Sequence, residues 1–269
     1  KIMSPKILGQ HFLNDVSVAT RIVDSSHFAG CHTIVEIGPG RGALTDLIVK
    51  SFSNVFLIEL DAGLSSYITE KHRNNPNVSI FNADARTIDI ETVLGSSSSE
   101  YLLIGNLPYY AAKRIIRNFL EHKYVPKQMV VMVQKEVGEE MAAKSGNQTL
   151  LSLSVQVYAD IDILFTVPPS SFLPPPKVHS SVIRLTPRLH SSVKRSDLKT
   201  FFLTARAVFY LPRKQLHNSL ALGITIHASE AKDLIGKADI DSSRRPGTLT
   251  ISEINRLAGI LSNNGFYGV

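Results

Sequence analysis

The sequence is poor in cysteine and has no long hydrophobic run. Cys31 is the only cysteine among 269 residues. It has no partner for an internal disulfide and cannot build a zinc site alone, so we expect a small buried side chain there. No apolar run approaches the ~18 to 20 residues of a membrane-spanning helix. The first residues, KIMSPKILGQHFL, lack the hydrophobic and cleavage regions of a signal peptide. We therefore expect a cytoplasmic protein without a metal ion or a membrane partner.

Charge is unevenly divided along the chain. Apolar residues make up 43% of the sequence and charged residues 19%, which is typical of a soluble protein with a substantial core. Residues 1–187 carry 17 Lys and Arg against 17 Asp and Glu, whereas residues 188–269 carry 12 against 6 and account for the net charge of +6. A basic C-terminal third favours a polyanionic partner, nucleic acid before membrane. A solvated basic face is the alternative that charge alone leaves open.

Short apolar runs alternate with helical patterns in the first half of the chain. Nearly continuous apolar runs indicate parallel strands that are buried on both faces. Their alternation with helices predicts a Rossmann-like, doubly wound α/β sheet, whose ligands bind beyond the carboxyl ends of the strands. The expected strands are 33–37, 54–60, 78–82, 101–105 and 128–133, and the expected helices are 16–29, 42–51, 62–73, 111–122 and 135–144.

The second half of the chain changes character after Pro187. Before it, residues 150–158, 161–167 and 178–186 have the pattern of strands without helix-length spacers, so we expect an antiparallel edge on the mostly parallel sheet. After it, helical periodicity dominates, with helices expected at 195–210, 213–222, 228–235 and 252–262. We therefore expect an α/β domain over residues 1–187 and a small all-helical domain over residues 188–269.

A glycine-rich turn follows the first of these strands, in VEIGPGRGALT at residues 35–45. Gly38 and Gly40 permit a tight turn and a close approach of the backbone to a ligand. The third glycine comes two residues after the second, and not three as in the dinucleotide fingerprint, so the spacing disfavours NAD. A strand-to-helix turn without a ligand is the plain alternative.

Two acidic residues end the next two strands. Glu59 follows the glycine turn by about the ~20 residues at which a carboxylate reaches ribose hydroxyls. Asp84, in FNADAR, ends the third strand and is placed to accept a hydrogen bond from an adenine amino group. Each acid alone would more often be a solvated loop residue, but glycines, Glu and Asp at three consecutive strand ends together favour a nucleoside ligand.

The fourth strand ends in IGNLPYY, residues 104–110. Pro108 restricts the turn, so the side-chain oxygen of Asn106 and a nearby backbone carbonyl can both accept from one exocyclic amine. Tyr109 offers a face on which a base stacks once it has left its own helix. A turn that merely caps the strand is the alternative. Because this motif would lie opposite a nucleoside site, we favour the interpretation that it holds the N6 amine of an adenine.

Eight segments in this order resemble one family, the ribosomal RNA adenine dimethyltransferases, and in particular their bacterial small-subunit members. The segments are GQHFLND at 9–15, EIGPGRGALT, IELD, NADAR, GNLPYY, QKEVGEEMAA at 134–143, FLPPPKVHSSVIRL at 172–185 and FYLPRKQLHNSL at 209–220. The resemblance implies an enzyme that uses S-adenosyl-L-methionine to transfer two methyl groups, one after the other, to N6 of adjacent adenines. The implied substrate is a hairpin of small-subunit rRNA, on an immature small ribosomal subunit.

The resemblance also implies a role for individual residues. The implied cofactor contacts are His11, Leu13, Gly38, Gly40, Glu59, Asp84 and Asn106. The implied target-amine motif consists of Asn106, Leu107, Pro108 and Tyr109, and Phe172 is the second wall of the base sandwich. Phosphate contacts are implied for Arg213 and Lys214. Residues 1–187 are then the cofactor-binding catalytic domain and residues 188–269 the RNA-binding domain of a monomer. His11 stands where the family usually has Asn, and Tyr110 where many members have Asn or His.

Three other functions are compatible with parts of this pattern. A methylase of large-subunit rRNA, of the resistance type, would share the chemistry, but the long basic C-terminal domain and the PPPKV segment disfavour it. A non-catalytic factor for ribosome assembly or nucleic-acid binding would keep the cofactor pocket only as a relic. The intact set of site residues disfavours this alternative. An NAD-dependent oxidoreductase is disfavoured by the glycine spacing and by the motif around Asn106.

Overall fold

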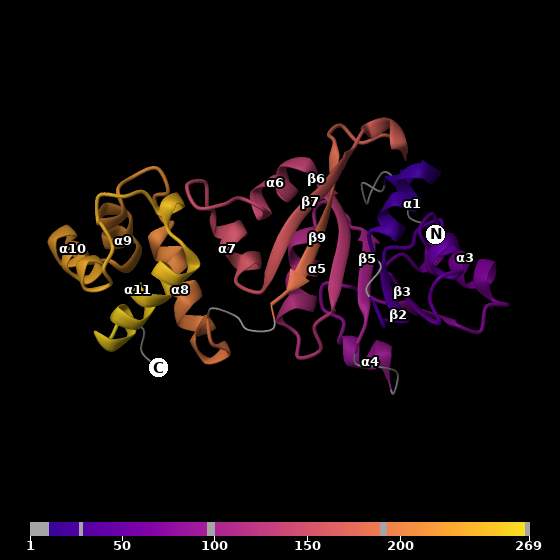
Figure 1. Ribbon diagram of the computed structural model, residues 1–269, viewed down its shortest axis with the longest axis horizontal. Coiled ribbons are helices and arrows are strands. Elements are labelled where there is room, and N and C mark those ends of the chain that lie inside the picture. The colour runs from indigo at the N-terminus through magenta and orange to yellow at the C-terminus, as the bar shows by residue number, and fades with distance from the viewer. Residues whose placement is uncertain (1–10, 27–28, 96–99, 189–192, 267–269) are drawn as a thin grey trace. The chain divides into compact units, whose positions relative to one another are not determined.

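The computed structural model describes residues 11–26, 29–95, 100–188 and 193–266 (Figure 1). The chain forms two compact units. The first, here called the sheet unit, comprises Lys1–Gly138 and Ala159–Pro187, and the second, the helical unit, comprises Glu139–Tyr158 and Arg188–Val269. The segment GQHFLND is described from His11 onward.

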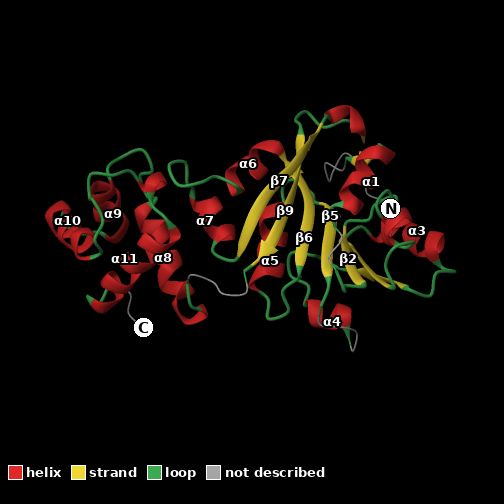
Figure 2. Cartoon of the chain, viewed as in Figure 1, coloured by secondary structure: helices red, strands yellow, loops and turns green. Residues whose placement is uncertain are grey.

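The sheet unit is built on seven strands in the order β4-β3-β2-β5-β6-β9-β7 (Figure 2). The first five strands along the chain after β1 are mutually parallel where they pair, which confirms the predicted doubly wound sheet. Four of them are buried along most of their length, as expected for strands with helices on both sides, whereas β4 at the edge of the sheet has no buried residue. The strands are β2 (Thr33–Ile37), β3 (Asn54–Glu59), β4 (Val78–Asn82), β5 (Leu102–Asn106) and β6 (Gln128–Gln134).

The strand order reverses between β2 and β5. From β2 the chain adds β3 and β4 on one side, and then returns to add β5 and β6 on the other. Ile37 pairs with Gly105 in register, and a Cβ atom at Gly105 would lie 2.6 Å from the carbonyl oxygen of Ile37. Gly38 and Asn106, which come next in the chain after this pair, are therefore brought side by side. A reversal of this kind is where ligands bind in doubly wound sheets.

Two antiparallel strands complete the sheet. The strand β9 (Ser180–Pro187) pairs antiparallel with both β6 and β7 (Ala159–Val167). This confirms the antiparallel edge, with the detail that β9 lies one position inside the sheet and β7 is outermost. A separate two-stranded sheet joins β1 (Phe12–Leu13) to β8 (Phe172–Leu173). No sequence pattern predicted it, because two residues are too few to show a period.

The helices of the sheet unit follow the predicted order. We expected most of them, but α4 is an addition, and α2 is shorter than its predicted range. Their bounds are α1 (Val16–Asp24), α2 (Thr45–Ile48), α3 (Ala62–His72), α4 (Ile90–Leu94), α5 (Ala112–Glu121) and α6 (Lys135–Met141), with a short 3-10 turn, η2, at Pro169–Ser171.

The helical unit corrects one prediction. Residues 150–158 were expected to form a strand, but Leu150–Gln156 is the helix α7. Thr149 and Ser152 form a reciprocal capping box at its start, which stabilises a helix at that point. Leu153 and Val157 pack into the apolar core of the helical unit. Local capping and tertiary burial together therefore favour the helix over the strand that the apolar run suggested.

Four longer helices form the rest of the helical unit, as predicted. They are α8 (Leu198–Val208), α9 (Leu216–Ile224), α10 (Ala228–Lys237) and α11 (Ile251–Asn263), with 3-10 turns η3 (Arg195–Asp197) and η4 (Pro246–Thr248). Gly223 lets α9 approach α8 closely, since a Cβ atom there would lie 2.5 Å from the carbonyl oxygen of Ala207. The two-unit division differs from the predicted one at residues 139–158, which belong with the helical unit because α7 shares its core.

Candidate functional site

The strand ends at the reversal point open into one pocket of the sheet unit. It holds about 780 Å³ of empty space, its open mouth included. Its walls come from the turns after β2 and β5, the end of β3 and the segment around β1. Nine predicted site residues line it, namely His11, Leu13, Gly38, Gly40, Glu59, Asn106, Leu107, Pro108 and Tyr109, together with Phe12, Glu36, Pro39, Arg41, Ala43, Leu44 and Leu64.

The glycine turn and Glu59 form one wall of this pocket. Gly38 and Gly40 have φ angles of +66° and +55°, which residues other than glycine rarely adopt. The Glu59 side chain is only 5% exposed, and its two carboxylate oxygens accept the N–H groups of Gly40 (3.1 Å) and Asp61 (3.0 Å). Burial raises the pKa of Glu59. The two oxygens offer about four acceptor positions, more than these N–H groups occupy, so a ligand with hydroxyl groups would compensate for the burial of the carboxylate.

Glu36 is a second buried carboxyl group of the pocket, and sequence reasoning assigned it no role. The Oγ1 of Thr45 donates a hydrogen bond to its Oε2 at 2.7 Å. Burial raises the pKa of Glu36 to about 8. The group is therefore largely protonated at neutral pH. A charged residue inside an otherwise apolar strand was the signal in the sequence that pointed to it.

Asp84 lies in a neighbouring pocket, here called the Asp84 pocket, with about 360 Å³ of empty space. Gly38, Glu59 and Pro108 line both pockets, so the two adjoin. The side chain of Arg86 donates to both oxygens of Asp84 and lowers the pKa of this carboxyl group. The structure thus places Asp84 beside the first pocket, as we expected from its position after the end of a parallel strand.

Asn106 has a defined orientation at the end of β5. Its Nδ2 donates to the backbone carbonyl of His11 at 3.0 Å. A carbonyl oxygen can only accept, so the NH2 group must face His11, and among the described residues none donates to the Asn106 Oδ1. The carbonyl of Pro108 accepts the N–H groups of Ala111 and Ala112 at the start of α5, whereas that of Leu107 has no partner in the described part of the chain. Two hydrogen-bond acceptors thus remain free beside the pocket.

Tyr109 and His11 present aromatic rings to the same pocket. The ring centroids are 5.9 Å apart, with the planes inclined by 33°. The Tyr109 hydroxyl is 2.7 Å from the Ser180 hydroxyl on β9, and burial raises its pKa. The His11 Nδ1 lies 2.8 Å from the carbonyl oxygen of Pro174, so this nitrogen carries a proton. Both rings are therefore held in place by contacts to residues later in the chain, Ser180 on β9 and Pro174 after β8.

Phe172 is not brought to the pocket. Its side chain is 3% exposed and packs in the core of the sheet unit, where β8 pairs with β1 and Leu13 is its partner in register. His11, and not Phe172, is the ring nearest Tyr109 among the lining residues. The role of Phe172 as a second wall remains a prediction.

The comparison with known proteins decides the family. The model of the family described as "Ribosomal RNA adenine dimethylase" matches residues 4–261. The chain is 38% identical over 252 residues to a ribosomal RNA small subunit methyltransferase A of Dehalococcoides mccartyi, covering 94% of this chain and 86% of the relative. It is also 38% identical over 268 residues to the protein of that name from Alkaliphilus oremlandii, covering 96% and 91%. The chain belongs to the ribosomal RNA adenine dimethylase family.

Solved structures agree on the fold. A dimethyladenosine transferase from Plasmodium falciparum superposes with a TM-score of 0.79 at 22% identity, covering 95% of this chain and 98% of that one. The 23S rRNA methyltransferase ErmE superposes with a TM-score of 0.71 at 21% identity, covering 93% and 99%. Membership of the dimethylase family rests on the sequence matches, and it makes the chain a methyltransferase.

S-Adenosylmethionine use follows from the family, and the pocket fits this group. The buried Glu59 carboxylate has spare acceptor sites for ribose hydroxyls, and the adjoining Asp84 pocket has mainly apolar walls and a carboxylate for a base. The backbone at Gly40 must stay bare, because a Cβ atom there would lie 3.2 Å from the Phe12 ring. Among the described residues, no cluster of His, Cys, Asp or Glu would hold a metal ion. Within the described ranges, no helix has the length and apolar character to cross a membrane.

The other predicted site, Arg213 and Lys214, lies in the helical unit. Both residues are exposed in the turn between α8 and α9. The buried Ser219 hydroxyl holds this turn, donating to the Val208 carbonyl (2.6 Å) and accepting the Leu211 N–H (2.8 Å). Neither predicted cation has a polar side-chain partner in the described part of the chain.

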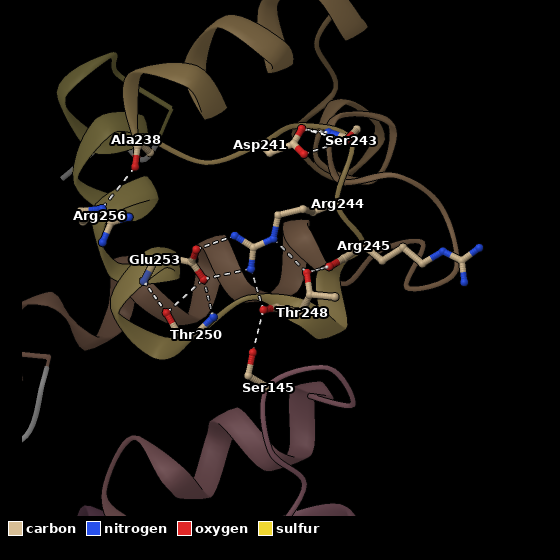
Figure 3. Close-up of polar contacts among 10 residues, drawn as sticks. All are labelled: Ser145, Ala238, Asp241, Ser243, Arg244, Arg245, Thr248, Thr250, Glu253 and Arg256. Carbon is tan, nitrogen blue, oxygen red and sulfur yellow. Dashed lines mark hydrogen bonds and ion pairs between the residues drawn. The ribbon is translucent and has the colours of Figure 1, made fainter.

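A loop rich in Ser and Arg lies against the same turn. The Leu216 N–H donates to the Arg244 carbonyl at 2.7 Å. Arg244 itself points inward, to Glu253 and Thr248, whereas Arg245 extends away from this network (Figure 3). Arg245 is exposed. The sequence did not single it out as a candidate RNA-binding residue, because nothing in the sequence distinguishes it from the neighbouring Arg244. The helical unit thus exposes Arg213, Lys214 and Arg245 on two segments whose backbones meet at Leu216 and Arg244.

Proposed function

We propose that this protein dimethylates N6 of two adjacent adenines in a hairpin of small-subunit rRNA during ribosome biogenesis. The observation that carries the proposal is the orientation of Asn106, beside the glycine turn, with free acceptors on its Oδ1 and on the Leu107 carbonyl. The relatives that share 36–38% identity with nearly the whole chain are named small-subunit methyltransferases, which supports this target over large-subunit rRNA.

The cofactor site is proposed to consist of residues on three strand ends and β1. His11 and Leu13 contact the cofactor from the segment around β1, and Gly38 and Gly40 allow its close approach. Glu59 accepts from the ribose hydroxyls, as its spare lone pairs allow. Asp84 faces the base from the adjoining pocket. When bound, S-adenosylmethionine supplies an electrophilic methyl group on a sulfonium.

The target base is proposed to be clamped by the motif at the end of β5. Asn106 and the Leu107 carbonyl accept the two N6 hydrogens of adenine, so the nitrogen lone pair is held toward the methyl donor. Pro108 keeps the turn rigid, and the face of Tyr109 stacks on the base after it leaves its helix. No strong base is required for this transfer, and the proton of N6 passes to water. Phe172 is proposed as the second wall of the base sandwich, opposite Tyr109.

The two parts of the chain are proposed to divide the work. Residues 1–187 would bind the cofactor and perform catalysis, with the exception of the α7 segment, which packs with the helical unit. Residues 188–269 would bind RNA, with Arg213, Lys214 and Arg245 contacting phosphates. We propose that the protein acts as a cytoplasmic monomer on immature small ribosomal subunits.

Radiolabelled S-adenosylmethionine tests this function directly. The protein would be incubated separately with immature small subunits, large-subunit precursors and naked rRNA, and the labelled nucleoside identified by mass spectrometry. We expect dimethyladenosine in the small-subunit RNA with the wild-type protein and its loss with Asn106→Ala. Label in the large-subunit RNA would instead assign the resistance-type activity. Binding of small subunits without any label would assign a non-catalytic role in assembly.

A further inference from the structure

The carboxylate of Asp84 accepts hydrogen bonds from a neighbouring arginine on both of its oxygens. The Arg86 backbone N–H and Nε both donate to Oδ1 at 2.9 Å, while Nε and Nη2 donate to Oδ2 at 2.9 and 2.6 Å. A carboxylate oxygen offers about two acceptor positions. The single Nε–H is shared between the two oxygens, so three N–H groups of one residue make these four contacts and leave Asp84 little free acceptor capacity.

Both residues lie in the pocket where a nucleoside base would bind. Asp84 and Arg86 are among the few charged groups of the Asp84 pocket, whose other walls are mainly apolar and include Tyr110. A mainly apolar pocket with a carboxylate at Asp84 suits a purine ring that carries an amino group. A purine amino group that bonds to Asp84 therefore competes with Arg86 for the same two oxygens.

We propose that Arg86 competes with the purine amino group for Asp84 and thereby weakens the binding of the adenosine part of the cofactor. The inference rests on the proposed use of the pocket for S-adenosylmethionine and its demethylated product. Arg86 would then act as a positioning residue that keeps Asp84 neutralised while the pocket is empty and yields when the base enters.

The structure makes this exchange feasible. The side chains of Arg86 and Asp84 are 33% and 27% exposed, so water can reach both groups as the bond shifts. Among the described residues, the Arg86 side chain hydrogen-bonds to Asp84 alone, so its release requires only a rotamer change. Partly exposed ion pairs of this kind are weak. We therefore expect a moderate effect of Arg86 on affinity, about three- to five-fold.

Calorimetric titration with S-adenosylhomocysteine tests the competition. This product lacks the positive sulfur, so removal of an arginine does not act on it through simple charge repulsion. We expect Arg86→Met to bind it about three- to five-fold more tightly than the wild type. The control Arg73→Met removes an arginine whose ion pair with Glu70 is exposed and lies outside both pockets, and it should leave the affinity unchanged.

A second ligand isolates the amino group. In this analogue of S-adenosylhomocysteine, an unsubstituted purine replaces adenine, so it has no amine to compete with Arg86. The gain in affinity of Arg86→Met should vanish with it. An equal gain with both ligands, or an unchanged or weaker affinity of Arg86→Met for S-adenosylhomocysteine, would overturn the inference.

Two further controls separate possible failures. Arg86→Gln is titrated alongside Arg86→Met, with the thermal midpoint of each variant as a check of folding, so that the inference does not depend on one substitution. If the wild-type protein failed to bind S-adenosylhomocysteine at all, the proposed cofactor would be wrong, and the inference would fall with it. Wild-type binding without the predicted change in the variants overturns the inference alone.

Discussion

Replacement of Glu36 by Gln tests the electrostatics of the cofactor pocket. Glu36 is 1% exposed, and Thr45 donates to its carboxyl group. Because burial raises its pKa from 4.5 to about 8, the native protein binds a proton at this site at neutral pH. Gln has nearly the same size and keeps an acceptor for Thr45, but it cannot ionise. The substitution thus removes the titration and preserves most of the packing.

The sign and size of the effect follow from the two pKa values. Between pH 4.5 and about 8, the native state holds a proton that the unfolded state has released, so the free energy of unfolding falls as the pH rises. The stabilisation from the neutral acid is complete below pH 4.5 and is lost as the pH passes through about 8. Each pH unit in this interval corresponds to about 1.4 kcal/mol. The whole interval therefore corresponds to roughly 5 kcal/mol at most.

Urea unfolding of the full chain at pH 5, 7 and 9, followed by circular dichroism, measures the effect. We expect the stability of Glu36→Gln relative to the wild type to rise by several kcal/mol from pH 5 to pH 9, by the same linkage. Glu70→Gln is the matched control, because Glu70 is exposed and the same substitution there should give a nearly constant difference. Parallel profiles for Glu36→Gln and the wild type would refute the reasoning and mean that Glu36 is ionised in the pocket.

The remaining predictions concern the proposed roles. Asn106→Ala should lower kcat for methyl transfer by about a hundred-fold or more, because a positioned hydrogen-bonding group at a reaction centre contributes on this scale, whereas near wild-type activity would remove Asn106 from the clamp. Tyr109→Ala should lose ~1 to 3 kcal/mol of base stacking, measured as kcat/KM with RNA, and Tyr109→Phe should retain most of it. Glu59→Ala should weaken S-adenosylhomocysteine binding in a calorimetric titration, and an unchanged Kd would contradict its ribose contact. Replacing Arg213 and Lys214 by Gln should make the salt dependence of RNA binding shallower by about 1.8 in log–log slope if both contact phosphates, and an unchanged slope would exclude them.

Most of the sheet unit could be predicted from the sequence, because buried parallel strands and their connecting helices leave strong local patterns. The runs at Thr33–Ile37 and Val78–Asn82 coincide with the strands that form. The failure at residues 150–158 has a physical reason. A short apolar run does not distinguish a strand from a buried helix, and here the capping box and the core of the helical unit favour α7.

The site was predictable to the extent that its residues end neighbouring strands. Glycines, Glu59 and Asn106 stand at strand ends, and parallel strands end at the same edge of a sheet, so their proximity followed from the order of the elements. The orientation of each side chain did not follow. That Asn106 turns its NH2 group to the His11 carbonyl depends on a contact between residues 95 positions apart in the chain.

The sequence by itself determined the class of sheet, the family and the set of strand-end residues, because these depend on local periodicity and on motifs that are contiguous in the chain. The tertiary structure alone decided which residues share a pocket and which protons they hold. Burial between strands makes Glu36 a weak acid, the pairing of β1 with β8 places Phe172 in the core, and the side chain of Arg86 occupies Asp84. Desolvation and hydrogen bonding act over distances of a few ångströms in space, and the sequence alone does not show which groups come that close.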